Sequence, residues 1–216
     1  MKKMRVAVLI SGRGSNMEAL IEACRDKEYP AGIVLVISSR PGAKGLEYAK
    51  RAGIRTEVVN HTEFESRDAF EEAIHTILKE TKVELVCLAG FMRVLNPSFV
   101  NRWRDRILNI HPSLLPAFKG LHTHERVLDA GVRFTGCTVH IVRPEMDDGP
   151  IIIQAVVPIT PKDTPGALAA KVLEFEHKIY PEALSMMAQG RARVSGNLVY
   201  VKGKKIKAKG LINPPF

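Results

Sequence analysis

Short apolar runs that alternate with helical stretches constrain the fold of this chain more than any other feature. The runs are almost uninterrupted, as expected for strands buried on both faces of a parallel sheet. They lie at residues 5–11, 32–37, 56–59 and 83–89. Helix-like stretches separate these runs. Two lie at residues 16–24 and 46–52. A third follows Ser66, which can cap it, and carries the apolar stripe Phe70, Ala73, Ile74, Ile77 and Leu78. The alternation predicts an α/β fold with a doubly wound, mostly parallel central sheet.

The pattern changes after a fifth run, which ends at His111. A long loop over 112–123 leads to a helix over 124–130, and two strands at 135–142 and 151–158 flank the turn at 144–150. We expect a long helix after Asp163-Thr164-Pro165, kinked or divided at Pro181, and a final hairpin over 193–207. The sequence therefore predicts an antiparallel C-terminal portion within one domain, 1–216.

Size and charge narrow the function classes. A chain of 216 residues suits one domain with a full core. No apolar run approaches the roughly 20 residues that cross a bilayer, and the apolar stretch after the basic start is too short for a signal peptide. We expect a cytoplasmic protein. The net charge of +9 favours acidic partners. Part of it lies in the lysine-rich tail 202–209, which we interpret as a solvated edge strand.

Cysteines and histidines give no metal signature. Cys24, Cys87 and Cys137 are far apart and lie among apolar or small residues, so we expect buried reduced thiols. His122 and His124 precede a helix, and no Cys or Glu completes a ligand set with His111 and His140. We expect no metal, with His124 as a helix cap.

Asn109 and His111 carry the strongest chemical signal. They lie two residues apart at the end of an apolar run, so on a strand both point to the same side of the sheet. Pro112 and Pro116 rule out a continuing strand, which places both groups where a sheet edge opens into a loop, the usual ligand position in α/β proteins. An amide beside an imidazole can stabilise an oxyanion and move a proton, as acyl transfer requires.

Three other segments are candidate binding or catalytic elements. Asp147-Asp148-Gly149 is either an ordinary acidic turn or a carboxylate aimed at His111 that favours the imidazolium. Residues 12–16 form a glycine-rich turn that either binds phosphate or only caps a helix, since the spacing fits neither a P-loop nor a dinucleotide fingerprint. The loop 90–95 either holds a flat heterocycle or packs into the core.

Together these segments resemble the glycinamide ribonucleotide formyltransferase family of purine synthesis. The matching pieces are VLISGRGSN, LAGFMRVL, LNIHPSLLP, GLHTHE, GCTVH, DDGPII and EHKIYP, in order from Val8 to Pro181. LNIHPSLLP with a later Asp-x-Gly is typical of all formyltetrahydrofolate-using transferases. GRGSN, GLHTHE and EHKIYP narrow the resemblance to the glycinamide ribonucleotide branch.

The resemblance implies a Rossmann-like formyltransferase fold and a direct transfer from 10-formyltetrahydrofolate to the amine of glycinamide ribonucleotide. Asn109 and His111 would hold the oxyanion of a tetrahedral intermediate, with His111 protonated as general acid. Asp147 would keep His111 charged and order a water. Gly14, Ser15 and Asn16 would grip the phosphate, and Glu176 the glycyl amine end. The folate residues would be Arg67, Met92, Arg93, Val94, Leu95, Arg143, Pro144, Glu145 and Met146.

On the same resemblance, about 1–105 would form a phosphate-binding half and about 106–216 a catalytic and folate half. The partners would be the ribonucleotide and the folate, with no metal, nucleic acid or membrane, in a monomer or homodimer. Asp148 stands where a small residue is expected, so which aspartate faces His111 stays open, although the spacing favours Asp147.

Three alternatives compete with this interpretation. A formyltetrahydrofolate hydrolase would need an N-terminal regulatory domain and a methionyl-tRNA formyltransferase a larger C-terminal one. The early start and the final hairpin favour a free-standing enzyme instead. A nucleic-acid-binding module would leave the Asn-x-His pair unexplained, and the basic tail lacks stacking aromatics. A catalytically dead relative is disfavoured because Asn109, His111 and Asp147 are all present.

Overall fold

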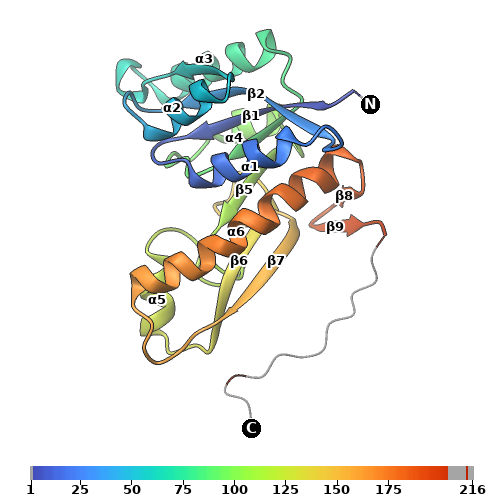
Figure 1. The fold of residues 1–216 in the computed structure, drawn as a ribbon. Coiled ribbons are helices and arrows are strands. Elements are labelled where there is room, and N and C mark those ends of the chain that lie inside the picture. The colour runs from blue at the N-terminus through green and yellow to red at the C-terminus, as the bar shows by residue number, and fades with distance from the viewer. Residues whose placement is uncertain (1, 204–212, 214–216) are drawn as a thin grey trace.

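A computed structural model of the protein describes residues 2–203 and 213 (Figure 1). The strands of its main sheet are β1 Met4–Ile10, β2 Ala31–Ser38, β3 Arg55–Val58, β4 Leu85–Leu88, β5 Ile107–His111, β6 Phe134–Ile141 and β7 Ile151–Pro158. The helices are α1 Ser15–Arg25, α2 Lys44–Arg51, α3 Arg67–Glu80, α4 Pro97–Arg102, α5 Thr123–Asp129 and α6 Pro165–Ala188, with a 3₁₀ turn at His61–Glu63. A separate hairpin pairs β8 Ala192–Ser195 with β9 Leu198–Val201.

The seven-stranded sheet has the order β3-β2-β1-β4-β5-β6-β7. Strands β1 to β5 pair in parallel, whereas β5 with β6 and β6 with β7 are antiparallel. This confirms the predicted α/β fold with a doubly wound, mostly parallel sheet and an antiparallel C-terminal portion. The order in which strands are added reverses between β1 and β4, and ligands of open α/β sheets usually bind at the carboxyl ends of the strands at such a switch point.

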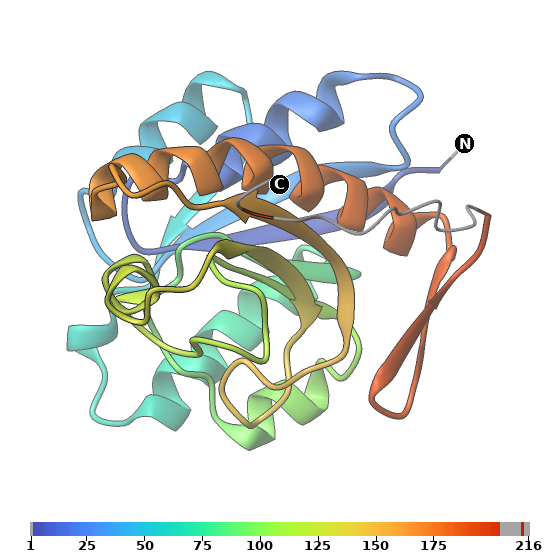
Figure 2. The same cartoon turned by 90° about the horizontal axis from the view of Figure 1, so that it is seen from below.

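Helices cover both faces of the sheet (Figure 2). Along β1, Val6, Val8 and Ile10 belong to the core beneath α1, α2 and α6, while Ala7 and Leu9 belong to the core beneath α3 and α4. Because strand side chains alternate between faces, a strand buried on both sides must be apolar at every position. This is why the apolar runs in the sequence are nearly unbroken.

Three predicted elements differ from the structure or extend beyond its described residues. Helix α6 runs on through Pro181, so the alternative in which that proline divides the helix is wrong. The helix packs against α1, β6 and β7, and this burial outweighs the roughly 3 kcal/mol that an interior proline costs. His122 occupies the N-cap position of α5 without a side-chain hydrogen bond, and His124 lies inside the first turn of the helix, so the predicted cap role of His124 is also wrong. Residues 204–207 of the predicted hairpin and 204–209 of the tail lie outside the described residues.

Buried hydroxyl groups connect the loops that follow β1, β2 and β4. Ser11, directly after β1, exchanges a 2.7 Å hydrogen bond with Ser39 and accepts one of 2.9 Å from the backbone N–H of Met92. The glycine-rich loop after β1 is therefore tied to the loop after β4. Within residues 2–203 and 213, no helix has the length and apolar character needed to cross a membrane.

Candidate active site

Strand β5 places Asn109 and His111 on one face of the sheet, as the sequence predicted. Their neighbours Leu108 and Ile110 belong to the core on the α6 side, so the two polar side chains face the opposite side. His111 is 6% exposed, and its Nδ1 lies 3.3 Å from Asp147 Oδ2. Its Nε2 lies 2.9 Å from the carbonyl oxygen of Phe118. Residues far apart in sequence thus converge on one imidazole.

The turn after β6 aims Asp147 at this imidazole. Gly149 permits the turn, because a Cβ there would lie 1.7 Å from the carbonyl oxygen of Ile141. Asp147 itself has a positive φ of 53°, and its Oδ2 accepts a 2.9 Å hydrogen bond from the Gly120 N–H. Asp148 points elsewhere and forms an ion pair with Lys119. The geometry therefore separates the two carboxylates: Asp147 faces His111, and Asp148 ties the turn to the 112–123 loop.

His140 joins the group from the neighbouring strand. The antiparallel register pairs it with Asn109, and its Nε2 lies 3.2 Å from Asn109 Nδ2 and 3.7 Å from Asp147 Oδ1. Burial lowers the pKa of His140, although the Ile141 carbonyl and the Asp147 carboxylate act in the opposite direction. A neutral His140 with its proton on Nδ1, directed to the Ile141 carbonyl at 3.1 Å, can accept from the Asn109 amide. This fixes which way that amide points.

A hollow of about 500 Å³ opens in front of these groups. Asn109, His111, His140 and Asp147 line it, together with the loops Gly90–Leu95 and Val142–Met146. All predicted folate residues except Arg67 therefore reach it. Its apolar side chains include several that are more than half exposed: Met92, Val94, Leu121 and Met146. Apolar walls with a few polar groups at the base suit a flat aromatic ligand.

Arg67 stands apart from this hollow. Its Nη1 donates a 3.1 Å hydrogen bond to Asn96 Oδ1, one residue beyond the lining loop. The structure thus places Arg67 beside the loop and not among the residues that line the hollow.

A second hollow of about 440 Å³ lies against α6. It is lined by Arg13, Pro112, His124 and Glu176, with the small residues of the first turns of α6. Pro112 lines both hollows. The two hollows therefore approach each other at the residue that follows His111.

The glycine-rich loop borders this second hollow. Gly14 has a φ of 80° and caps α1, so the first backbone N–H groups of that helix, from Ser15 onward, have no partner within it. Helix N-termini of this kind attract phosphate. Asn16 donates a 2.6 Å hydrogen bond from Nδ2 to Glu176 Oε2, and its own Oδ1 is buried without a partner. Arg13 supplies a positive charge in the hollow.

Glu176 makes folding stability depend on pH in a defined direction. Burial raises the pKa of its carboxyl, and the hydrogen bond from Asn16 opposes this effect. The folded chain then holds this proton more tightly than the unfolded chain, so the contribution of Glu176 to stability is full below the pKa of an exposed glutamate. It is lost as the pH rises through the raised folded pKa.

We therefore expect Glu176→Gln to melt at a higher temperature than the wild type at pH 8, with the difference vanishing toward acid pH. Thermal unfolding followed by circular dichroism between pH 5 and 8 tests this. Glu174→Gln, at an exposed position on the same helix, serves as the control and should show no pH-dependent difference. A Glu176→Gln difference of the same size at every pH would contradict the prediction.

Sequence reasoning missed the roles of Arg13, His124 and His140 in lining the hollows. The alternation of β6 would have placed His140 on the Asn109 face had the antiparallel register been known.

Cys87 and Cys137 are buried free thiols as predicted, and Cys24 is half-buried. Burial raises the pKa of Cys137 to about 12, which makes it a poor nucleophile. Over residues 2–203 and 213, no three His, Cys, Asp or Glu side chains are grouped to hold a metal ion.

Comparison with known proteins agrees with this fold. A family model described as formyl transferase matches residues 4–184. The chain therefore belongs to the formyl transferase family.

Within that family, the phosphoribosylglycinamide formyltransferase of Haemophilus influenzae is 42% identical over 209 residues, covering 97% of this chain and 99% of that protein. The crystal structure of glycinamide ribonucleotide transformylase 1 from Symbiobacterium toebii matches with a TM-score of 0.90 at 44% identity, over 92% of this chain and 94% of that one.

A longer relative shares the same region. The trifunctional purine biosynthetic protein adenosine-3 of Bos taurus is 52% identical over 196 residues, which is 91% of this chain. The match spans only 19% of that protein's length.

Proposed function

We propose that this protein transfers the formyl group of 10-formyltetrahydrofolate to the amine of glycinamide ribonucleotide in purine biosynthesis. The observation that carries the proposal is the pair of hollows that share Pro112, next to His111. One is largely apolar and suits a folate, and the other has a cation and a helix N-terminus beside it and suits a phosphorylated substrate. The names of the relatives support formyl transfer to the glycinamide ribonucleotide.

The transfer step needs one bond made and one broken. The amine nitrogen of the ribonucleotide attacks the formyl carbon, and the carbonyl oxygen takes up the electron pair as an oxyanion. The C–N bond to the folate then breaks, and the proton lost by the amine is balanced by one gained at the folate nitrogen. Asn109 has one amide hydrogen engaged by His140 and a second available for the oxyanion. Donors aimed at developing charge lower the barrier of such a step.

His111 is proposed as the protonated general acid. Its Nε2 faces a carbonyl oxygen, which only accepts, so this nitrogen carries a hydrogen. Its Nδ1 faces the Asp147 carboxylate at 3.3 Å, which also only accepts when ionised. Both contacts are satisfied together only by the doubly protonated imidazolium. Delivery of the proton to the folate, directly or through a water ordered by Asp147, requires Nε2 to leave the Phe118 carbonyl when the substrates bind.

The binding roles follow the two hollows. We infer that Gly14, Ser15 and Asn16 grip the substrate phosphate and that Glu176 receives hydrogen bonds from its glycyl amine end. Residues 92–95 and 143–146 would hold the folate. Arg67, which lies beside the end of the loop 90–95, would contact the folate only there. The predicted division into halves at about residue 105 stays part of this proposal, with the qualification that each hollow draws residues from both halves.

A cytoplasmic location is also part of the proposal. It is supported by the free thiols of Cys24, Cys87 and Cys137, since reducing compartments keep cysteines unpaired.

The reaction is proposed to need no metal, because the folate already activates the formyl carbon. The remaining tasks are positioning, oxyanion stabilisation and proton transfer.

A formyl-transfer assay tests the proposed function. The folate absorbance change is followed with a 10-formyl folate donor in the presence and in the absence of glycinamide ribonucleotide. We expect turnover that requires the ribonucleotide. Consumption of the donor at the same rate without the ribonucleotide would indicate a hydrolase, and no consumption with either would refute the proposed acceptor.

A further inference from the structure

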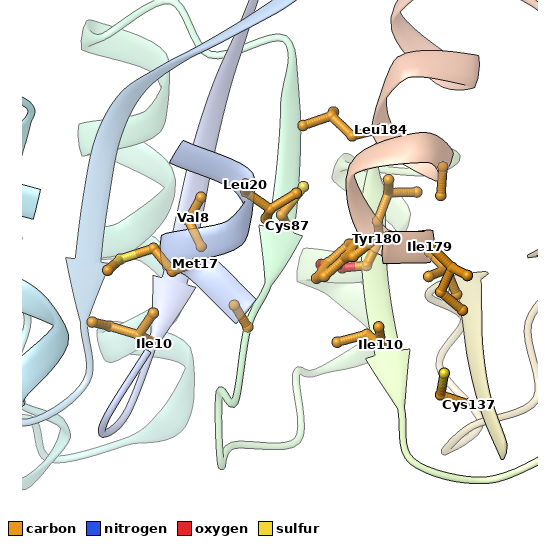
Figure 3. Packing of buried hydrophobic residues seen from close by; sticks show 14 of the residues in the cluster. Val8, Ile10, Met17, Leu20, Cys87, Ile110, Cys137, Ile179, Tyr180 and Leu184 are labelled. Atoms are coloured by element: carbon orange, nitrogen blue, oxygen red, sulfur yellow. The ribbon is translucent and has the colours of Figure 1, made fainter. Parts of the chain in front are cut away.

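Tyr180 is a buried polar side chain that the proposed chemistry does not use. Its side chain is 0% exposed, and its hydroxyl lies 3.0 Å from the carbonyl oxygen of Leu88 and 3.2 Å from that of Leu108. Figure 3 shows the ring reaching from α6 over β5, with its oxygen on the side of β4. Burial raises the pKa of the phenol well above its ordinary value, so the hydroxyl keeps its proton and acts as a donor.

The two carbonyl groups that Tyr180 contacts lie directly beside Asn109 on strands β4 and β5. Leu88 is the last residue of β4, and it is the register partner of Asn109 on β5. Leu108 is the residue directly before Asn109. Beyond this point β4 leaves the sheet and continues into the loop 90–95, which lines the larger hollow. The hydroxyl therefore links the two strands where they separate.

Tyr180 acts from the face of the sheet opposite to Asn109. The ring belongs to the core on the α6 side, together with Leu108 and Ile110, whereas Asn109 points to the other side. A phenylalanine would fill the same space without the cost of burying a hydroxyl. One turn earlier, Glu176 of the same helix bonds Asn16 beside the second hollow. One stretch of α6 thus contacts the elements that line both hollows.

We propose that Tyr180 is a positioning residue for formyl transfer, whose hydroxyl holds the ends of β4 and β5 so that the Asn109 amide keeps its place between the two substrates. The inference rests on the proposed function for its kinetic part. A shift of about 1 Å at a reacting group can lower a rate on the order of 100-fold, so loss of such a brace is expected to be measurable.

The first test compares Tyr180→Phe with Tyr29→Phe. Tyr29 is the matched control, because its hydroxyl also donates to a backbone carbonyl beside the same part of α6, that of Pro181 at 2.5 Å, whereas the Leu88 and Leu108 carbonyls are partners of Tyr180. We expect Tyr180→Phe to lower kcat by about 3- to 30-fold with little change in either KM. Tyr29→Phe should keep the wild-type kcat. Equal kcat values for the two variants would overturn the proposal.

A double-mutant cycle distinguishes positioning of Asn109 from general loosening. If Tyr180 acts through Asn109, adding Tyr180→Phe to Asn109→Ala should lower kcat by less than about twofold further. A loss in that background as large as in the wild type would refute the inference.

A third readout needs no activity. The side-chain amide of Asn109, observed by NMR with ¹⁵N-labelled asparagine and assigned by its absence in Asn109→Ala, should shift in Tyr180→Phe and not in Tyr29→Phe. If the wild type does not formylate glycinamide ribonucleotide, the proposed function fails and this signal still decides the role of Tyr180. An unshifted signal in Tyr180→Phe would refute it.

Discussion

Replacing His111 with alanine is expected to lower kcat for formyl transfer on the order of 100- to 10,000-fold, the range that general acid catalysis contributes. The side chain is buried at the base of the larger hollow, and both its nitrogens face acceptors, Asp147 and the Phe118 carbonyl. Its removal takes away the proton donor for the departing folate nitrogen. The rate should be measured with both substrates saturating, so that a change in affinity does not hide the change in chemistry.

Two controls make the His111 result specific. His75→Ala removes a histidine on α3 that pairs with Trp103, away from both hollows, and should keep the wild-type kcat. Added imidazole should restore part of the rate of His111→Ala, because a small acid can enter the space left by the side chain. A His111→Ala variant with near wild-type kcat would show that another group supplies the proton.

The fold was predictable where one local pattern decides it. The unbroken apolar runs of β1 and β2 reflect burial on both faces, and the stripe from Phe70 to Leu78 lies on α3 as expected. The alternation of side chains along β5 was also sufficient to place Asn109 and His111, which are two residues apart, on one face. These conclusions depend only on the two-residue period of a strand and the 3.6-residue period of a helix.

The contacts between elements were not predictable in the same way. His140 meets Asn109 only because β6 runs antiparallel to β5 in one particular register, which no local pattern specifies. Asn16 and Glu176 are brought together from opposite ends of the chain when α6 packs against α1. The course of α6 through Pro181 likewise depends on tertiary packing, since local preference alone favours a break.

The choice between Asp147 and Asp148 shows the same limit. Spacing favoured Asp147, but the reason lies in the turn: Gly149 must pass so close to the Ile141 carbonyl that no side chain fits. This close approach turns Asp147 inward and leaves Asp148 beside Lys119. The glycine of the Asp-x-Gly pattern is therefore a steric requirement of the turn.

Asn109→Ala is expected to lower kcat on the order of 100- to 1,000-fold, which corresponds to about 2.7–4 kcal/mol of lost transition-state stabilisation. The amide is oriented by His140 and faces the hollow where the formyl oxygen would lie. Because the oxyanion exists only during the reaction, the KM for each substrate should change little.

The matched control is Asn101→Ala, at an exposed position on α4, which should leave both constants at wild-type values. Asn109→Asp sharpens the test, because it keeps the size of the side chain but turns the amide donor into a carboxylate that repels the oxyanion. We expect its kcat to be at least as low as that of Asn109→Ala. An Asn109→Ala variant with a raised KM and an unchanged kcat would instead assign Asn109 to substrate binding, and the oxyanion role would pass to His111 alone.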